Sequence, residues 1–182
     1  MTKRRNVIVH IATSADGYIA RPDGDIDWLA TRPAPKGFYG MDAFMKSIDT
    51  TVLGRKTYDV SLRLGATFGS KKSRTIVFSR NAAPANVPSG VEFVNDAIGP
   101  FMKDLREQPG KDIWLMGGGE LIASFLDAQA IDEFVISVVP VFIGDGIPLI
   151  ARRHRTTHLN LLSTERFEDG LVQLRYSLQD NS

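Results

Sequence analysis

Three consecutive glycines, Gly117, Gly118 and Gly119, are the residues of this chain best suited to holding a ligand. They follow a short apolar segment, residues 113–116, and an apolar segment with helical spacing comes directly after them. Glycine lets a ligand approach the main chain, and the free amides at a helix start attract anions, phosphates above all. The alternative is a tight strand-to-helix turn without a ligand. We favour the ligand, because such a turn needs only one or two glycines.

Neither standard nucleotide-binding motif is present. The dinucleotide fingerprint needs a third glycine three positions after the second. If Gly117 and Gly119 are the first two, that position holds Ile122. A phosphate loop of the Walker type would end in Gly-Lys-Ser/Thr, a sequence that the chain lacks. A dinucleotide at these glycines therefore requires a different fold.

Cations and hydroxyl groups follow two other predicted strands. One segment is Gly54-Arg55-Lys56-Thr57, and the other is Ser79-Arg80. Arg55 and Lys56 would open a helix, where positive charge opposes the helix dipole, so a bound phosphate would explain both cations. A solvated basic helix start is the alternative. Because ligands of open α/β sheets lie across the carboxyl ends of the strands, the three strand ends together predict one extended anionic ligand.

The composition excludes several other kinds of site. A net charge of +1 gives no reason to expect a nucleic-acid or membrane surface, and the absence of cysteine excludes disulfides and thiol nucleophiles. No apolar run approaches the ~20 residues of a membrane helix or forms a signal peptide. His154 and His158 are four residues apart, but neighbouring arginines would repel a metal ion. We predict one cytoplasmic domain over residues 1–182, without a metal site.

Strands alternate with helices along most of the chain. The predicted strands are residues 7–14, 50–53, 73–78, 91–94, 113–116 and 131–139, and the predicted helices are residues 38–48, 55–62, 96–107 and 119–126. Residues 21–37 read as a long loop, and residues 159–167 and 171–178 as a β-hairpin that turns at residues 168–170. This order predicts a single α/β domain with a mostly parallel mixed sheet and a C-terminal antiparallel hairpin.

The order of these motifs resembles a known family. Gly54-Arg55-Lys56-Thr57, Phe78-Ser79-Arg80 and Gly117-Gly118-Gly119, at these intervals, resemble the dihydrofolate reductase fold. They are most similar to the branch containing the C-terminal reductase domain of bifunctional riboflavin-biosynthesis deaminase-reductases. Residues 14–20 resemble that branch's Ser-x-Asp-Gly-x-Ile-Ala signature, and residues 143–149 resemble its Gly-x-Gly-x-Pro-Leu loop. The resemblance covers residues 6–178 and implies a three-layer dihydrofolate reductase-like domain.

The resemblance implies NADPH rather than NADH as the cofactor. The positions that match the adenosine 2′-phosphate site are Arg55, Lys56, Ser79 and Arg80. Those that match the pyrophosphate site are Gly54, Thr57, Gly117, Gly118, Gly119, Glu120 and Leu121. Ala12 and Ile19 match positions that line the nicotinamide. This assignment agrees with the phosphate already expected at the three strand ends.

The substrate side is less well defined by the sequence. Asp16 and Asp42 are the candidate catalytic acids, and Ser14, Trp28 and Phe44 are the candidate substrate contacts. Alternatively, the Asp16 side chain caps the turn at Gly17 and has no catalytic role. A solvated helix carboxylate is the favoured alternative for Asp42. Trp28 either packs on the ring system or pins its loop.

Two functions fit these residues. The first is an NADPH-dependent reductase that transfers hydride to a small conjugated heterocycle, pterin-like or pyrimidine-like. The second is an NADP(H)-binding protein without turnover, a sensor or scaffold. The zinc deaminase domain of the full riboflavin enzyme needs paired cysteines, which this chain lacks. The resemblance also implies a homodimer. Pro140 inside the apolar run at residues 135–143 indicates either an edge strand, which a partner subunit would cover, or a break in the strand.

Overall fold

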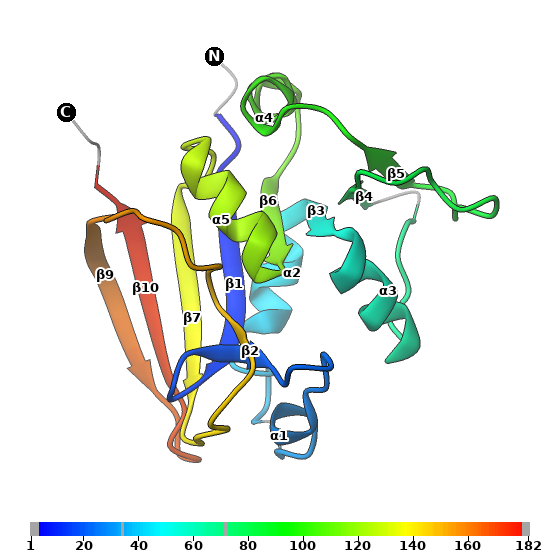
Figure 1. Cartoon of the computed structure of the whole chain (residues 1–182). Helices are drawn as coiled ribbons and strands as arrows, with labels where there is room; N and C mark the ends of the chain where they lie inside the picture. Colours follow the sequence, from blue (N-terminus) through cyan, green and yellow to red (C-terminus); the bar gives the residue numbers. More distant parts are fainter. Residues whose placement is uncertain (1–3, 34, 71–72, 180–182) are drawn as a thin grey trace.

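One eight-stranded sheet organises residues 4–33, 35–70 and 73–179, the residues that this computed structural model describes (Figure 1). Its strands are β1 Val7–Ser14, β3 Ile48–Gly54, β4 Arg74–Phe78, β5 Val91–Val94, β6 Asp112–Gly117, β7 Glu133–Val139, β9 Leu159–Arg166 and β10 Val172–Leu178. A small second sheet pairs β2 Tyr18–Ala20 with β8 Ile147–Pro148. The helices are α1 Asp27–Ala30, α2 Met41–Ser47, α3 Arg55–Arg63, α4 Ile98–Glu107 and α5 Gly119–Asp127.

The strand pairings confirm the predicted fold class. The order across the large sheet is β5-β4-β3-β6-β1-β7-β10-β9, and every pairing from β5 to β7 is parallel. β10 runs antiparallel to both β7 and β9, so the predicted C-terminal hairpin is present. Parallel strands need crossover connections: α3 connects the neighbours β3 and β4, whereas α4 connects β5 to β6 and α5 connects β6 to β7, which are not adjacent.

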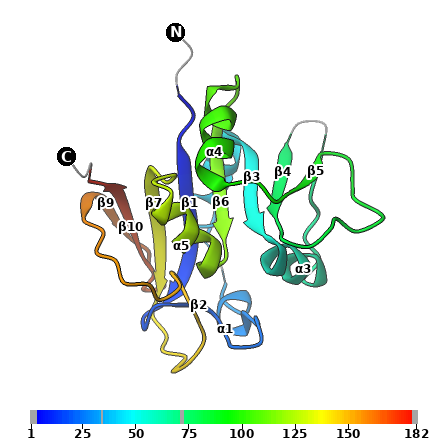
Figure 2. The same cartoon turned by 45° about the horizontal axis from the view of Figure 1, so that its top comes forward.

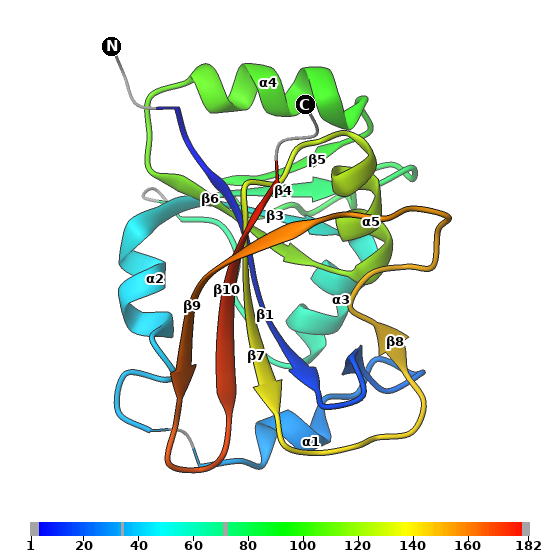
Figure 3. The same ribbon diagram turned by 90° about the vertical axis from the view of Figure 1, so that its left-hand side faces the viewer.

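Helices cover both faces of the sheet. α4 and α5 lie in front of β1 and β6 in Figure 2, over an apolar core that includes Leu115 and Phe125. α2 lies on the opposite face (Figure 3), where the Phe44 ring contacts Trp114 with 5.8 Å between centroids. Side chains alternate between faces along a strand. Ile113 and Leu115 therefore reach the main core, while Trp114 between them meets α2.

The predicted helix at residues 38–48 is wrong at both ends. Gly37, Phe38, Tyr39 and Gly40 have φ angles of 82°, 48°, 55° and 79°, a left-handed turn that a right-handed helix cannot include. α2 therefore begins at Met41, and β3 already begins at Ile48. The predicted loop at residues 21–37 contains the short helix α1, which periodicity did not reveal.

Of the two alternatives predicted for residues 135–143, the break at Pro140 is confirmed and the edge strand is wrong. β7 pairs with β1 on one side and β10 on the other, and it ends at Val139, before Pro140. β9 is instead an edge of the large sheet, with all eight of its residues exposed. The other predicted strands and helices agree with the structure to within a residue or two. None of the helices in the described part of the chain is long and apolar enough to span a bilayer.

Candidate active site

The three strand ends singled out in the sequence lie side by side. β3 is between β4 and β6, and its last residues pair Gly54 with Phe78 and Leu53 with Gly117. Ser79 follows Phe78 directly, so the residues after all three strands share the carboxyl edge of the sheet. This is the arrangement expected for one ligand that extends across the three ends.

Two helices begin against each other at this edge. α3 has Gly54 as its N-cap and α5 has Gly118, and neither residue carries a side-chain oxygen that would satisfy the first-turn amides. A Cβ on Gly118 would lie 3.1 Å from Thr57 Oγ1, and a Cβ on Gly54 would lie 3.9 Å from the Gly117 carbonyl oxygen. The amides of both helix starts are therefore close together and available to an anion.

The glycines also have packing roles. A Cβ on Gly119 would lie only 2.4 Å from the Pro148 carbonyl oxygen, so no larger residue fits without moving the backbone. Gly117 has a φ of 120°, which other residues rarely adopt, and the peptide bond to Gly118 is cis. Gly118 has an ordinary φ of −80° and only the Thr57 hydroxyl near its Cβ position. A close contact thus explains Gly119, and the positive φ explains Gly117. Neither reason explains Gly118.

The predicted phosphate-binding cations differ in how they are held. The Arg55 guanidinium pairs with Asp59 at 2.8 Å and lies over the Phe93 ring, 5.4 Å from its centroid. Lys56 and Arg80 are exposed. The Ser79 hydroxyl donates to the Asn81 carbonyl at 2.8 Å and accepts from the Asn81 amide at 3.1 Å, so it shapes the loop after β4.

The two family signatures in the sequence contact each other. Asp16 accepts hydrogen bonds from the amides of Ile143, at 3.2 Å, and Gly144, at 2.8 Å, so it fastens residues 143–149 rather than capping the turn at Gly17. A hydrogen bond with Ser14 and then these amide bonds hold the pKa of Asp16 below its ordinary value. The carboxylate stays ionised near neutral pH, which suits an anchor better than a proton donor.

Ser14 and Trp28 are both buried next to the predicted nicotinamide position. The Ser14 hydroxyl accepts a hydrogen bond from the Tyr18 amide at 3.0 Å and holds the turn before β2. Trp28 packs with Tyr39, and Ala12 lies against the same apolar cluster. The Trp28 ring therefore pins its loop. Within the described residues, its buried Nε1 has no hydrogen-bond partner.

Asp42 and Phe44 lie on opposite sides of α2. Asp42 is exposed in the first turn, as expected for a solvated carboxylate, and it is the one acid of this helix. Phe44 faces the sheet and packs edge-on against His10, with 4.5 Å between ring centroids. Of these two predicted site residues, Phe44 therefore points toward the interior and Asp42 does not.

A buried polar cluster on this face was missed by the sequence analysis. The Gln173 amide donates to Ser137 Oγ at 3.0 Å and to the Tyr39 carbonyl at 3.2 Å, and it lies 3.5 Å from His10 Nε2. Burial lowers the pKa of His10 to about 4, so the ring is neutral at pH 7. Three strands far apart in the chain supply these side chains, and no local spacing signals such a cluster.

Comparisons with known proteins decide the family. Residues 5–173 match the family model of the RibD C-terminal domain. The chain belongs to the RibD C-terminal domain family. The uncharacterized protein YwjB of Bacillus subtilis is 37% identical over 172 residues, which cover 94% of this chain and 97% of YwjB. The resemblance inferred from the motifs is confirmed.

Solved structures agree with this membership of the RibD C-terminal domain family. A protein of Shewanella sp. PV-4 that is named for riboflavin biosynthesis has a TM-score of 0.83 and 32% identity, with 96% of this chain and 99% of that chain covered. Dihydrofolate reductase of Enterococcus faecalis, solved with NADP(H) and RAB-propyl, has a TM-score of 0.63 at 18% identity, with 99% of this chain and 100% of that chain covered. The second likeness establishes the dihydrofolate reductase-like fold.

Proposed function

We propose that this protein is an NADPH-dependent reductase that transfers hydride to a small conjugated heterocycle of the pterin or pyrimidine type. The observation that carries the proposal is the meeting of the α3 and α5 starts, both capped by glycine, at the carboxyl edge of β3 and β6. Two sets of free amides at one place fit a pyrophosphate. Membership of a reductase-domain family and the NADP(H) complex of a similar fold support the same cofactor.

The residues at the edge fit the parts of NADPH in order. Thr57 and the loop that contains Gly118 would hold the pyrophosphate, and Arg55 with its neighbours Lys56 and Arg80 would hold the adenosine 2′-phosphate. Asp59 and Phe93 fix the Arg55 guanidinium in place before any ligand arrives, which lowers the entropy lost on binding. The buried Ser79 hydroxyl would act by shaping the loop.

The nicotinamide would lie over β1 and β2, at Ala12 and Ile19. When bound, NADPH supplies the hydride, and the protein's task is to orient the two rings and exclude water. Trp28 closes this region and keeps its Nε1 donor free for a carbonyl or ring nitrogen of the substrate. Asp16 would act by anchoring residues 143–149 beside the cofactor.

A second candidate function is NADP(H) binding without turnover. It is favoured by one observation: the single acid of α2, Asp42, is exposed, so this helix brings no carboxylate to the interior. The two functions differ in one assay. Titration of NADPH followed by its oxidation with a panel of pterins and ribosylamino-pyrimidines would show binding and turnover for the reductase. Tight binding with no oxidation on the whole panel would instead identify a binding protein.

We also propose that the protein forms a homodimer through β9. This strand lies at the edge of the sheet with all its residues exposed, and three of them are leucines: Leu159, Leu161 and Leu162. An exposed edge strand with apolar side chains is a surface that a second copy of the chain can cover.

A further inference from the structure

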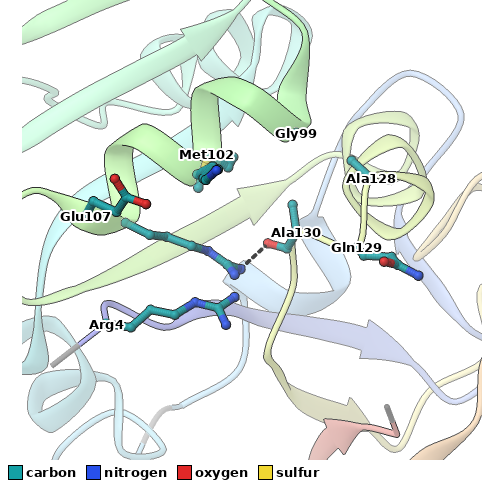
Figure 4. A pocket seen from close by; sticks show the side chains of 9 residues that line it. Arg4, Gly99, Met102, Glu107, Ala128, Gln129 and Ala130 are labelled. Atoms are coloured by element: carbon teal, nitrogen blue, oxygen red, sulfur yellow. Dashed lines mark hydrogen bonds between the residues drawn. The ribbon is translucent and has the colours of Figure 1, made fainter. Parts of the chain in front are cut away.

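A pocket of about 470 Å³ lies beside α4, near the amino ends of β1 and β7 (Figure 4). One face of α4 contributes Met102, Lys103, Arg106 and Glu107, and the turn after α5 contributes Gln129 and Ala130. Arg4, which precedes β1, lies at its border. The volume is in the range of sites for small molecules. The predicted cofactor residues follow the carboxyl ends of the strands, so this pocket is separate from them.

Positive charge exceeds negative charge around the pocket. Arg4, Lys103 and Arg106 are cations, and Glu107 is the one acid of the lining. A neighbouring carboxylate, Asp132, pairs with Arg106 at 2.9 Å and with Arg4 at 3.4 Å. One carboxylate thus serves two guanidinium groups, and Lys103 adds a third cation, so the surroundings favour an anion.

Arg106 is buried but not fully paired. Its side chain is 7% exposed, and its Nη2 donates to the Ala130 carbonyl oxygen at 2.8 Å, the dashed bond in Figure 4. In the part of the chain that the structure describes, its Nε has no hydrogen-bond partner. A buried donor without an acceptor is destabilising, and such groups call for an explanation beyond the fold.

Gln129 occupies a position where glycine would be more stable. The end of α5 is a Schellman motif, in which the Ala130 amide donates to the Phe125 carbonyl at 2.9 Å and the Gln129 amide donates to the Leu126 carbonyl at 3.1 Å. The residue after the C-cap of this motif is left-handed and usually glycine. Gln129 has a φ of 50° there. The Gln129 side chain is exposed, and Figure 4 shows it directed away from Arg4 and Met102, so its backbone rather than its amide borders the pocket.

The pocket follows the flank of α4 from its first turn to its last. Gly99 in the first turn lines it and leaves open space around its Cβ position, and Arg106 and Glu107 in the last turn line it as well. The two ends of the helix dipole therefore offset each other along the pocket, and its attraction for anions comes from the side-chain cations.

We propose that this pocket is a second ligand site, which binds the phosphate group of a small molecule or free phosphate. Lys103 and Arg106 supply the charge. Met102 and Ala130 offer an apolar wall to the rest of a phosphate ester. The site does not depend on the proposed reductase activity, because it shares no residue with the cofactor region.

The test is a titration of the full-length protein with sodium phosphate at constant ionic strength, followed by amide NMR. Saturable shifts are expected at Gly99, Lys103, Gln129 and Ala130. Phosphate will also reach the predicted cofactor residues, and their amides report that site separately. Glycerol phosphate distinguishes the source: half-saturation at a lower concentration than free phosphate assigns the site to phosphate esters, and equal half-saturation assigns it to phosphate itself.

Two variants make the result specific. Lys103→Glu is expected to weaken phosphate binding in the pocket roughly tenfold or more, while Lys46→Glu, the same charge change on α2, leaves it unchanged. Gln129→Gly is expected to raise the Tm by about 2–4 °C, because it relieves a strained φ, and to leave the phosphate affinity unchanged, because the Gln129 side chain points away from the pocket.

Several results would overturn the proposal. Linear shifts that do not saturate, or shifts scattered over the surface, would show only general screening of charge. Equal effects of Lys103→Glu and Lys46→Glu would show the same.

Discussion

The Thr57 hydroxyl oxygen lies 3.1 Å from the place that a Cβ on Gly118 would occupy. Thr57 is in the first turn of α3, and Gly118 is the N-cap of α5, so this contact brings two helix starts together. Each start presents unsatisfied amides. The proposed pyrophosphate site depends on this approach, and the glycines can be tested against it one at a time.

Gly118→Val is expected to lose NADPH binding, and Gly119→Ala is expected to lose stability. The φ of Gly118 is accessible to valine, so Gly118→Val should remain folded and lose NADPH binding, because the branched side chain fills the space beside Thr57. A Cβ on Gly119 would meet the Pro148 carbonyl at 2.4 Å, so Gly119→Ala should lower the free energy of unfolding. Thermal unfolding and fluorescence titration measure the two effects. A folded Gly118→Val protein with normal NADPH affinity would leave the glycines with a structural role alone.

Replacing both Arg55 and Lys56 by alanine is expected to weaken NADPH far more than NADH. Each charge-assisted contact contributes about 1.5–3 kcal/mol, or roughly ten- to a hundredfold in affinity. Calorimetric titration with the two cofactors gives the ratio directly. Arg63→Ala, in the last turn of the same helix, is the control and should change neither affinity. Equal losses for NADPH and NADH in the double variant would remove the assignment of the 2′-phosphate.

His10 is expected to make the fold sensitive to acid. Its pKa is about 4 in the folded protein and 6.5 in the unfolded chain, because burial disfavours the charged ring. The stabilisation from keeping His10 neutral is complete above pH 6.5 and is lost as the pH falls toward 4. The shift corresponds to a loss on the order of 3 kcal/mol.

Urea unfolding at several pH values tests the effect of His10. His10→Leu should have a flatter dependence of unfolding free energy on pH over this range, whereas His154→Leu, which alters an exposed ring, should behave as the unmodified protein does. Parallel curves for His10→Leu and the unmodified protein would show that another group sets the acid sensitivity.

Leu161→Glu is expected to convert a dimer into monomers. Leu161 is 57% exposed on β9, and a buried charge at an interface would oppose association. Leu64→Glu is a matched control, because Leu64 is 58% exposed at the end of α3. Light scattering after size-exclusion chromatography gives the mass of each variant. A monomeric unmodified protein, or a dimeric Leu161→Glu variant, would rule out β9 as the interface.

Local patterns predicted most of the fold because they determine most of it. The strand at residues 91–94 was predicted with its observed bounds, since turn residues enclose a short apolar run. Phe38 fits the apolar spacing of α2 and yet forms a left-handed turn with Tyr39. Hydrophobic spacing carries no information on the sign of φ, so it could not predict that α2 begins at Met41.

The candidate site also contains residues that local sequence patterns could predict and contacts that they could not. Residues that follow strand ends, such as Gly54 and Gly117, were found because topology places all such residues at one edge. The contacts of Asp16 with the amides of Ile143 and Gly144 span most of the chain, and so does the cluster around Gln173. These groups meet because segments that are distant in the sequence lie side by side, and no single stretch of sequence reveals that arrangement.

Hydride transfer is the most direct test of the proposed function. NADPH carrying deuterium at the transferable position of its nicotinamide would be incubated with the protein and each pterin or ribosylamino-pyrimidine of the panel, and the products analysed by mass spectrometry. We expect one deuterium in a reduced product, with NADPH strongly preferred over NADH. Saturable NADPH binding without label in any product would contradict reductase activity, and no NADPH binding at all would contradict the site itself.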